Sequence, residues 1–251
     1  MISVCMATYN GEKYLKPQIE SILCQLGKND ELVISDNFST DNTVNIIESF
    51  CDDRIKLFRF PQSKKLMRTR HGKEKNVTNN FENALRKSSG DYIFFADQDD
   101  VWKPEKIKTM MNYMKKYSLV MCNATTIDGY DSVLMEKLYS KNPLRKGILS
   151  FRARGCLCGM DRKLIAASLP IPKTIVSHDL WVGILAEFMN SYYFIDTPLV
   201  FHRRNIGNVS TDVTQKSKNS LFYKIYYRVN LLVNGFIRIV ARRKLIGRKN
   251  S

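Results

Sequence analysis

Carboxylate side chains gather in one short stretch of the 251-residue sequence, at Asp97-Gln98-Asp99-Asp100, directly after the apolar run 92–96. Three carboxylates within four residues repel one another, so the stretch favours a bound cation. Divalent ions such as Mg²⁺ and Mn²⁺ prefer carboxylate oxygen and often bridge to the phosphates of a substrate. Taken alone, the stretch is more typical of a solvated acidic turn that caps the helix expected after Pro104.

Two further groups of polar residues could do chemistry. Asp36 and Asp41 follow the apolar segment 31–35. His178-Asp179 stands immediately before an apolar, aromatic-rich helical segment. Ordinary helix capping explains each group equally well when it is considered by itself.

The sequence predicts alternating strands and helices, and these elements would position the polar groups. Apolar runs predict strands at 2–7, 31–35, 55–58 and 92–96, and helical spacing predicts helices at 14–26, from 44 and at 79–87. This alternation predicts an α/β fold with a mostly parallel sheet that helices flank on both faces. Ligands of such sheets bind beyond the carboxyl ends of the strands, which here carry Thr8–Gly11, Asp36–Asp41 and Asp97–Asp100.

The motifs are more informative as an ordered set. The set comprises Thr8-Tyr9-Asn10-Gly11, Asp36 to Thr43, Asn80-Phe81 with Ala84-Leu85, Asp97 to Lys106, His178 to Trp181, and Pro198 to Arg204 with Asn208-Val209-Ser210. It resembles the inverting nucleotide-sugar glycosyltransferases of family 2, which have the Rossmann-like GT-A fold. The resemblance spans residues 1–212, which we take as the catalytic domain, and leaves 213–251 as a C-terminal extension.

The resemblance implies a metal and a general base. Asp97 and Asp99 would form the family's DxD element and bind Mg²⁺ or Mn²⁺, with Asp99 the more direct ligand. The metal would neutralise charge on the departing nucleoside diphosphate. Asp179 would take the proton from an acceptor hydroxyl as that oxygen attacks the anomeric carbon from the opposite face. A single displacement of this kind inverts the anomeric configuration.

The resemblance also implies a UDP- or dTDP-sugar as the donor. Asp36 would accept a hydrogen bond from a pyrimidine ring N–H that cytosine lacks, and Arg203 or Arg204 would assist at the diphosphate. The full set expected to bind the donor is Thr8, Tyr9, Asn10, Asp36, Asp41, Asp97, Gln98, Arg203 and Arg204. The motifs look most like those of the rhamnosyltransferase branch, whose members use dTDP-rhamnose and lipid-linked acceptors to build bacterial surface polysaccharides such as O-antigen or capsule.

One segment departs from the family pattern. Relatives commonly have Tyr-Arg-x-His before Asn-Val-Ser, whereas this chain reads His202-Arg203-Arg204-Asn205. His202 is therefore a lid residue, a replacement for the aromatic residue, or a solvated loop histidine. His71, among the basic residues of 68–75, is expected on a surface loop.

Basic residues concentrate at the C-terminal end. The chain has 40 Lys and Arg against 24 Asp and Glu, a net charge of +16, and residues 213–251 hold ten of the basic residues and no acidic one. Apolar residues recur at near-helical spacing over 219–249, which predicts a basic amphipathic helix on an anionic membrane surface. The alternative is that the apolar stripe packs back on the catalytic domain.

The sequence indicates neither secretion nor a zinc site. Its six cysteines are scattered without a CxxC pair, and they are predicted to be small buried residues in a reducing compartment. No leader pattern opens the chain, and no run approaches the roughly 18 apolar residues of a spanning helix. We expect a cytoplasmic protein that is peripheral at the inner face of the cell membrane.

Two other classes of function compete. A non-catalytic basic protein that binds membrane or nucleic acid would explain the charge of +16. The carboxylates at Asp36, Asp97, Asp99 and Asp179 would repel a phosphate backbone, so no nucleic-acid partner is expected. A sugar nucleotidyltransferase also uses a carboxylate-bound metal, but it usually has a Gly-rich phosphate loop near its N-terminus, where this chain has none.

Overall fold

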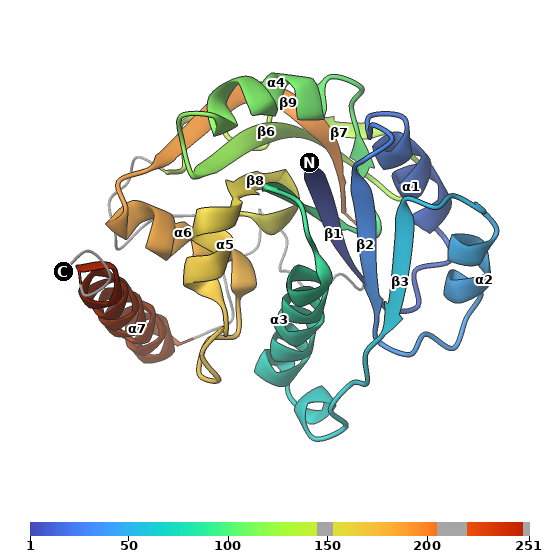
Figure 1. Cartoon of the computed structure of the whole chain (residues 1–251). Coiled ribbons are helices and arrows are strands. Elements are labelled where there is room, and N and C mark those ends of the chain that lie inside the picture. Colours follow the sequence, from blue (N-terminus) through green and yellow to red (C-terminus); the bar gives the residue numbers. More distant parts are fainter. Residues whose placement is uncertain (145–152, 205–219, 248–251) are drawn as a thin grey trace.

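The computed structural model describes residues 1–144, 153–204 and 220–247 of the chain (Figure 1). The strands are β1 Ile2–Thr8, β2 Glu31–Asp36, β3 Ile55–Arg59, β4 Tyr92–Asp97, β5 Val101–Trp102, β6 Leu119–Ile127, β7 Val133–Met135, β8 Cys158–Asp161 and β9 Tyr192–Arg203. The helices are α1 Leu15–Leu23, α2 Thr43–Glu48, α3 Arg70–Lys87, α4 Lys106–Met114, α5 Arg162–Ser168, α6 His178–Phe188 and α7 Leu221–Gly247, with short 3₁₀ turns at Leu66–Arg68 and Gly155–Leu157.

The strands form one curved sheet in the order β3-β2-β1-β4-β8-β6-β9-β5, and β7 pairs with β6. Helices α3, α5 and α6 lie on the concave side of the sheet, while α1, α2 and α4 lie on the other side (Figure 1). Side chains from both layers pack against the sheet and form a single apolar core. This arrangement confirms the predicted α/β fold with helices on both faces.

The first four strands in the sheet order pair in parallel, as predicted. β1 lies between β2 and β4, and β2 pairs with β3. Every residue of β2 is buried, because helices cover both faces of these strands, and this explains the continuous apolar runs in the sequence. All these strands therefore end at the same edge of the sheet.

The second half of the sheet is mixed. β8 runs antiparallel to both β4 and β6, β9 runs parallel to β6, and β5 runs antiparallel to β9. Val101 pairs with Phe201 and Trp102 with Val200. The pairing of β5 with β9 brings the C-terminal end of β9 beside the acidic stretch 97–100.

Helix α3 begins nine residues earlier than the sequence pattern indicates, at Arg70 rather than Asn79. Thr69 caps the helix, because its hydroxyl oxygen accepts a hydrogen bond from the backbone N–H of Gly72 at 3.0 Å. The expectation that His71 lies on a surface loop was therefore wrong. The first turns of α3 have few apolar side chains, so the helical period is weak there.

The cysteines divide into two groups. Cys5, Cys122, Cys156 and Cys158 are buried, as predicted, whereas Cys24 and Cys51 are exposed. Both exposed cysteines follow helices, and each thiol contacts a backbone carbonyl oxygen of the helix before it. No disulfide joins any of the six, which are all free.

Helix α7 confirms the predicted C-terminal helix and packs along one face against α6 and the end of α5. Leu231 is buried, and a Cβ at Gly235 would lie 2.8 Å from the ring of Phe188 in α6. The guanidinium of Arg238 donates to the backbone carbonyl oxygens of Ala167 in the last turn of α5 and of Leu169 and Pro170 just after it. The C-terminal helix therefore packs back on the rest of the protein, which was the predicted alternative to membrane contact.

The opposite face of α7 is apolar and exposed. We call this set the α7 outer stripe; its residues are Leu221, Phe222, Ile225, Tyr226, Val229, Val233, Phe236 and Ile237. Among the described residues, none of the helices is both long enough and apolar enough to cross a bilayer. The predicted boundary between 212 and 213, the Asn208-Val209-Ser210 motif and positions 219, 248 and 249 lie outside the described residues.

Candidate active site

The carboxyl ends of β1, β2 and β4 meet at one edge of the sheet. Thr8 pairs with Asp36 across β1 and β2, and Ala7 pairs with Asp97 across β1 and β4. This register places the loop after Thr8 between the two acidic segments. The structure thus brings together the three motifs that the sequence places at these strand ends.

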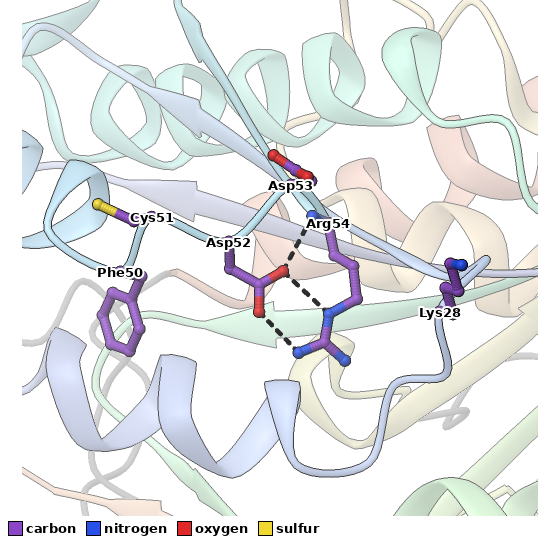
Figure 2. Close-up of a pocket in the computed structure, with 6 residues that line it drawn as sticks. All are labelled: Lys28, Phe50, Cys51, Asp52, Asp53 and Arg54. Carbon is purple, nitrogen blue, oxygen red and sulfur yellow. Dashed lines mark hydrogen bonds and ion pairs between the residues drawn. The ribbon is translucent and has the colours of Figure 1, made fainter.

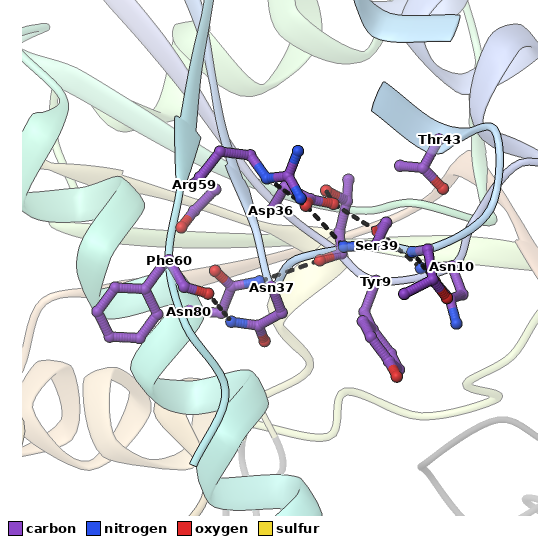
Figure 3. Close-up of polar contacts among 12 residues, drawn as sticks. Tyr9, Asn10, Asp36, Asn37, Ser39, Thr43, Arg59, Phe60 and Asn80 are labelled. Atoms are coloured by element: carbon purple, nitrogen blue, oxygen red, sulfur yellow. Dashed lines mark hydrogen bonds and ion pairs between the residues drawn. The ribbon is translucent and has the colours of Figure 1, made fainter. Parts of the chain in front are cut away.

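Asp36 lies at the centre of a buried polar network (Figure 3). Oδ1 accepts hydrogen bonds from the hydroxyls of Thr8 at 2.9 Å and Ser39 at 2.5 Å, and Oδ2 accepts from the backbone N–H of Ser39 at 2.9 Å. Oδ2 also forms an ion pair with Nε of Arg59 at 3.1 Å. These contacts offset the cost of burying the carboxylate, which is 0% exposed.

Exposed aromatic side chains flank this network. Tyr9 is 40% exposed and Phe38 is 51% exposed. The guanidinium of Arg59 lies 4.7 Å from the centre of the Phe38 ring. Phe38 has a φ of 58°, a left-handed conformation that is uncommon for an aromatic residue and that is often found at functional loops.

Arg59 is a site residue that the sequence analysis missed. It ends β3, which pairs with β2 and therefore brings Arg59 opposite Asp36 in register. A strand that pairs in parallel with β2 ends at the same sheet edge as Asp36. A basic residue at the end of the next predicted strand is therefore the sequence signal that could have identified Arg59.

Asn10 and Asp41 join the loops that follow β1 and β2. The backbone N–H of Asn10 donates to Oγ of Ser39 at 2.9 Å. Asp41 accepts hydrogen bonds from the hydroxyl of Thr43 at 2.5 Å and from the backbone N–H of Glu12 at 3.1 Å. These contacts hold the two loops together, and contact of Asn10 and Asp41 with a donor stays a prediction.

Gln98 connects the acidic turn to the first loop. Its Oε1 accepts a hydrogen bond from the backbone N–H of Tyr9 at 2.8 Å, and its Nε2 donates to the backbone carbonyl oxygen of Tyr9 at 3.1 Å. A Cβ at Gly11 would lie 2.5 Å from Oε1 of Gln98, so glycine is required while this pairing is kept. Gln98 therefore positions the backbone of Tyr9.

The acidic turn concentrates three carboxylates, of which Asp100 is buried and Asp97 and Asp99 are half-buried. Burial, and then the neighbouring charge of Asp100, raises the pKa of Asp97 to about 6. The same two causes raise the pKa of Asp99 well above its usual range. A bound cation would offset both burial and repulsion, and metal binding by Asp97 and Asp99 stays a prediction.

Asp100 is held by the end of β9. Its Oδ1 accepts hydrogen bonds from Nδ1 of His202 at 2.9 Å and from the backbone N–H of Arg203 at 3.0 Å. Nε2 of His202 lies 2.8 Å from Nη1 of Arg154 and accepts from it, because arginine only donates. Burial opposes ionisation of Asp100, but His202 outweighs it and lowers the pKa of the carboxyl.

His202 is therefore a buried strand residue, only 4% exposed. The expectation of a solvated loop histidine was wrong, because β9 extends to Arg203 and pairs with both β6 and β5. Asp100 and Arg154 both contact His202, although no sequence motif indicated this role for either residue. Strand order in the sheet, which a single sequence does not display, creates this cluster.

Asp100, Cys156 and His202 each place a possible ligand atom within 4.8 Å of the others. Oδ2 of Asp100 is buried and has no hydrogen-bond partner among the described residues, so one carboxylate oxygen is left for a cation. Burial, followed by the charges of Asp100 and Asp97, raises the pKa of the Cys156 thiol well above its ordinary value. A protonated thiol is a poor ligand, so these residues fit an oxygen-bound cation better than a thiolate-bound one.

Arg203 braces the acidic turn. Its Nε donates to the backbone carbonyl oxygen of Asp99 at 2.9 Å, and its Nη1 donates to that of Asp128 at 3.0 Å. Nη2 forms an ion pair with Asp131 at 2.6 Å. The backbone N–H of Arg204 donates to the backbone carbonyl oxygen of Ile127 at 2.8 Å. Contact of either arginine with a diphosphate stays a prediction.

Asp179 lies in the first turn of α6. Its Oδ1 accepts hydrogen bonds from the hydroxyl of Ser177 and from the backbone N–H of Leu180 at 2.7 Å. Its Oδ2 accepts from the backbone N–H of Gly155 at 3.3 Å. The charge of Asp179 contributes to the raised pKa of Asp97, so the two carboxylates lie within electrostatic reach.

A hollow at the opposite edge of the sheet has no part in this arrangement. It is lined by Lys28, Phe50, Cys51, Asp52, Asp53 and Arg54 (Figure 2). The guanidinium of Arg54 pairs with Asp52 and donates to the backbone carbonyl oxygens of Leu23 and Leu26. Arg54 therefore ties the end of α1 to the start of β3, which is a structural role.

The family is shown by a direct match. The model of the family described as "Glycosyl transferase family 2" matches residues 3–165, which include the ends of β1, β2 and β4. The chain belongs to this family. It is a glycosyltransferase, as the ordered motifs predict.

Two curated relatives match over most of both chains. The dTDP-rhamnosyl transferase RfbG of Shigella flexneri is 27% identical, with 93% of this chain and 81% of the relative covered. The UDP-Glc:alpha-D-GlcNAc-diphosphoundecaprenol beta-1,3-glucosyltransferase WfaP of Escherichia coli is 32% identical, with 93% and 94% covered.

A solved structure shares the fold. It is TarS 1–349 of Staphylococcus aureus in complex with UDP, with a TM-score of 0.66 and 17% identity. The match covers 93% of this chain and 64% of that one. This likeness confirms the predicted GT-A fold.

Proposed function

We propose that the chain is an inverting, metal-dependent glycosyltransferase. It moves a sugar from a UDP- or dTDP-sugar to a hydroxyl of a lipid-linked acceptor. The observation that carries the proposal is that the Asp36 network and the acidic turn with Asp97 and Asp99 meet at one sheet edge, with Asp179 of α6 within electrostatic reach of Asp97.

Asp36 and Arg59 match the edge of a uracil or thymine base. Such a base presents a ring N–H beside a carbonyl oxygen, which a carboxylate and a guanidinium can bind together. Arg59 covers Asp36, and its side chain is 39% exposed, so it can turn outward when a base enters. Tyr9 and Phe38 offer rings on which a base can stack. The donors in the names of RfbG and WfaP, dTDP and UDP, support this choice.

Asp97 and Asp99, together with the spare oxygen of Asp100, would hold Mg²⁺ or Mn²⁺. The ion supplies neutralisation of the charge on the departing diphosphate. Arg203 holds the backbone of Asp99 and so keeps this turn in place. A turn held in place in this way needs little rearrangement when charge develops.

Asp179 is the general base of this proposal. Hydrogen bonds from Ser177, Leu180 and Gly155 orient its carboxylate. It removes the proton from the acceptor hydroxyl while that oxygen forms a bond to the anomeric carbon. The bond from the anomeric carbon to the diphosphate oxygen breaks on the opposite face, and the configuration inverts.

Calorimetry of nucleotide binding tests the donor site. We expect UDP or dTDP to bind the wild type more tightly with Mn²⁺ than without it, and we expect Asp99→Ala to lose this metal dependence. Asp53→Ala is the matched control, since Asp53 is an exposed acidic residue at the opposite edge. Failure of both nucleotides to bind the wild type would overturn the proposal.

We propose rhamnose as the transferred sugar, because the motifs resemble those of rhamnosyltransferases and the chain is similar to RfbG. WfaP, by its name, takes a glucosyl donor and a diphosphoundecaprenol acceptor, which supports a lipid-linked acceptor here. Turnover of dTDP-rhamnose against UDP-glucose, on a diphosphoundecaprenol-linked sugar, tests both choices. A preference for UDP-glucose would reject rhamnose.

The α7 outer stripe is the proposed contact with an anionic membrane surface. Its exposed apolar residues can enter the headgroup layer, and exposed Lys224 and the basic residues of 242–249 in the sequence would attract anionic lipid. A lipid-linked acceptor would be met at that surface. The enzyme would then work at the cytoplasmic face of the cell membrane.

A further inference from the structure

The segment that leads into Asp179 is clamped by α3. Nζ of Lys75 donates to the backbone carbonyl oxygens of Pro172 at 3.1 Å and Ile175 at 2.7 Å. The hydroxyl of Thr78 donates to the carbonyl oxygen of Val176 at 2.7 Å. Thr78 also accepts from the backbone N–H at the start of α6, at 3.2 Å. One side of the segment is thus fixed by the catalytic domain itself.

The other side of the segment is held by α7. The hydroxyl oxygen of Tyr227 accepts hydrogen bonds from the backbone N–H groups of Val176 at 3.3 Å and Ser177 at 3.1 Å. Asn230 lies three residues after Tyr227 in α7, and its Oδ1 accepts a hydrogen bond from the hydroxyl of Thr174 at 3.0 Å. Two successive backbone donors just before α6 therefore depend on one side chain from the C-terminal helix.

Ser177 links these contacts to the carboxylate of Asp179. Ser177 is the N-cap residue of α6, yet its hydroxyl makes no capping hydrogen bond to the helix backbone. It donates to Oδ1 of Asp179 instead. The backbone of Ser177 is held by Tyr227, so the position of this donor follows from the position of α7.

We infer that Tyr227 is a positioning residue for the reaction, acting on Asp179 through Ser177. The inference rests on the proposed function, in which Asp179 is the general base. Without the Tyr227 hydroxyl, two partly buried N–H groups lose their acceptor and the segment shifts to find others. Proton transfer depends steeply on such placement, because a shift of about 1 Å can slow a reaction roughly 100-fold.

Helix α7 thereby has a second role beside its contact with lipid. One face presents the outer stripe, and the opposite face carries Tyr227 to the segment before Asp179. Removing the whole helix would therefore slow the reaction even with a water-soluble acceptor that needs no membrane. A helix that served only as a membrane anchor would not affect the reaction with such an acceptor.

The test compares Tyr227→Phe with Tyr223→Phe in the full chain. Tyr223 lies one turn earlier on α7, its ring stacks on Tyr227, and the change removes the same hydroxyl. We expect Tyr227→Phe to lower kcat between about tenfold and about 100-fold, with little change in KM for the donor. We expect UDP or dTDP binding to keep its wild-type affinity in both variants. Wild-type kcat in Tyr227→Phe would overturn the inference.

A double-mutant cycle with Asp179→Asn separates positioning from general loosening of the fold. If Tyr227 acts through the base, Tyr227→Phe adds little to the loss caused by Asp179→Asn. An equal further loss in that background would overturn the inference. Wild-type activity of Asp179→Asn alone would reject the proposed function itself, and this inference with it, which is a distinguishable result.

Discussion

At the scale of single residues, the acidic turn imposes a pH dependence on stability. Burial and Asp100 raise the pKa of Asp97 to about 6, compared with about 3.9 for an unfolded chain. The native state therefore binds this proton more tightly, so its stability falls as pH rises from about 4 to about 6. In metal-free buffer at pH 7, we expect Asp97→Asn to raise the free energy of unfolding by about 1–3 kcal/mol.

Urea unfolding at pH 4 and pH 7 measures this effect. The gain should shrink at pH 4, where the wild-type carboxyl is also neutral. Mn²⁺ should stabilise the wild type by mass action and should stabilise Asp97→Asn less. Asp53→Asn, at an exposed position, serves as the control and should leave the free energy of unfolding unchanged at both pH values. A less stable Asp97→Asn at pH 7 would contradict the electrostatic account.

The residues that the sequence predicts are those whose types recur in order along the chain. Thr8, Asp36 and Asp97 end three strands that the apolar runs identify, so their meeting follows from parallel pairing. Arg59 and His202 belong to the same edge only because of which strands are neighbours. That choice depends on packing across the whole sheet, which local patterns do not encode.

At the scale of elements, the close pairing of β1 with β4 depends on Gly90. A Cβ at Gly90 would lie 2.7 Å from the backbone nitrogen of Ser3 and 2.8 Å from the carbonyl carbon of Ile2. Backbone atoms cannot move aside as a side chain can. We expect Gly90→Ala to lower the free energy of unfolding by about 1–3 kcal/mol, as overpacking does.

Urea unfolding again provides the measurement for Gly90→Ala. Gly27→Ala is the matched control, because a Cβ there would meet only side-chain atoms of Asp30, the nearest being Oδ2 at 3.3 Å. Nucleotide binding should weaken in Gly90→Ala as well, since the β1–β4 register sets Ala7 opposite Asp97. Equal stability of the two alanine variants would show that β1 and β4 can separate without cost.

Element boundaries were predicted well where apolar spacing is strong. The strands β1, β2 and β4 match the expected runs within two residues. The first half of α3 was missed, because its polar side chains hide the helical period and only the cap at Thr69 marks its start. The antiparallel insertion of β8 also has no local signal, since direction in a sheet is decided by tertiary pairing.

At the scale of the whole molecule, the two interpretations of the C-terminal helix are compatible. The apolar residues of α7 form more than one stripe, so a single amphipathic pattern could not assign them. Leu231 is buried and Gly235 faces α6, while the outer stripe is exposed. Large exposed apolar surfaces usually mark an interaction site. The one proposed here is a membrane carrying negative charge.

The membrane contact is tested with the triple variant Phe222→Glu, Val229→Glu and Phe236→Glu, all at exposed stripe positions that leave Tyr227 in place. We expect the wild type to sediment with phosphatidylglycerol-containing vesicles, more weakly with phosphatidylcholine alone, and less as salt screens the charges. The triple variant should stay in solution. Leu134→Glu, at a 60% exposed apolar position on β7, is the control and should bind as the wild type does. If the triple variant instead binds vesicles normally but changes from dimer to monomer in light scattering, the stripe joins two copies of the chain and the membrane proposal is wrong.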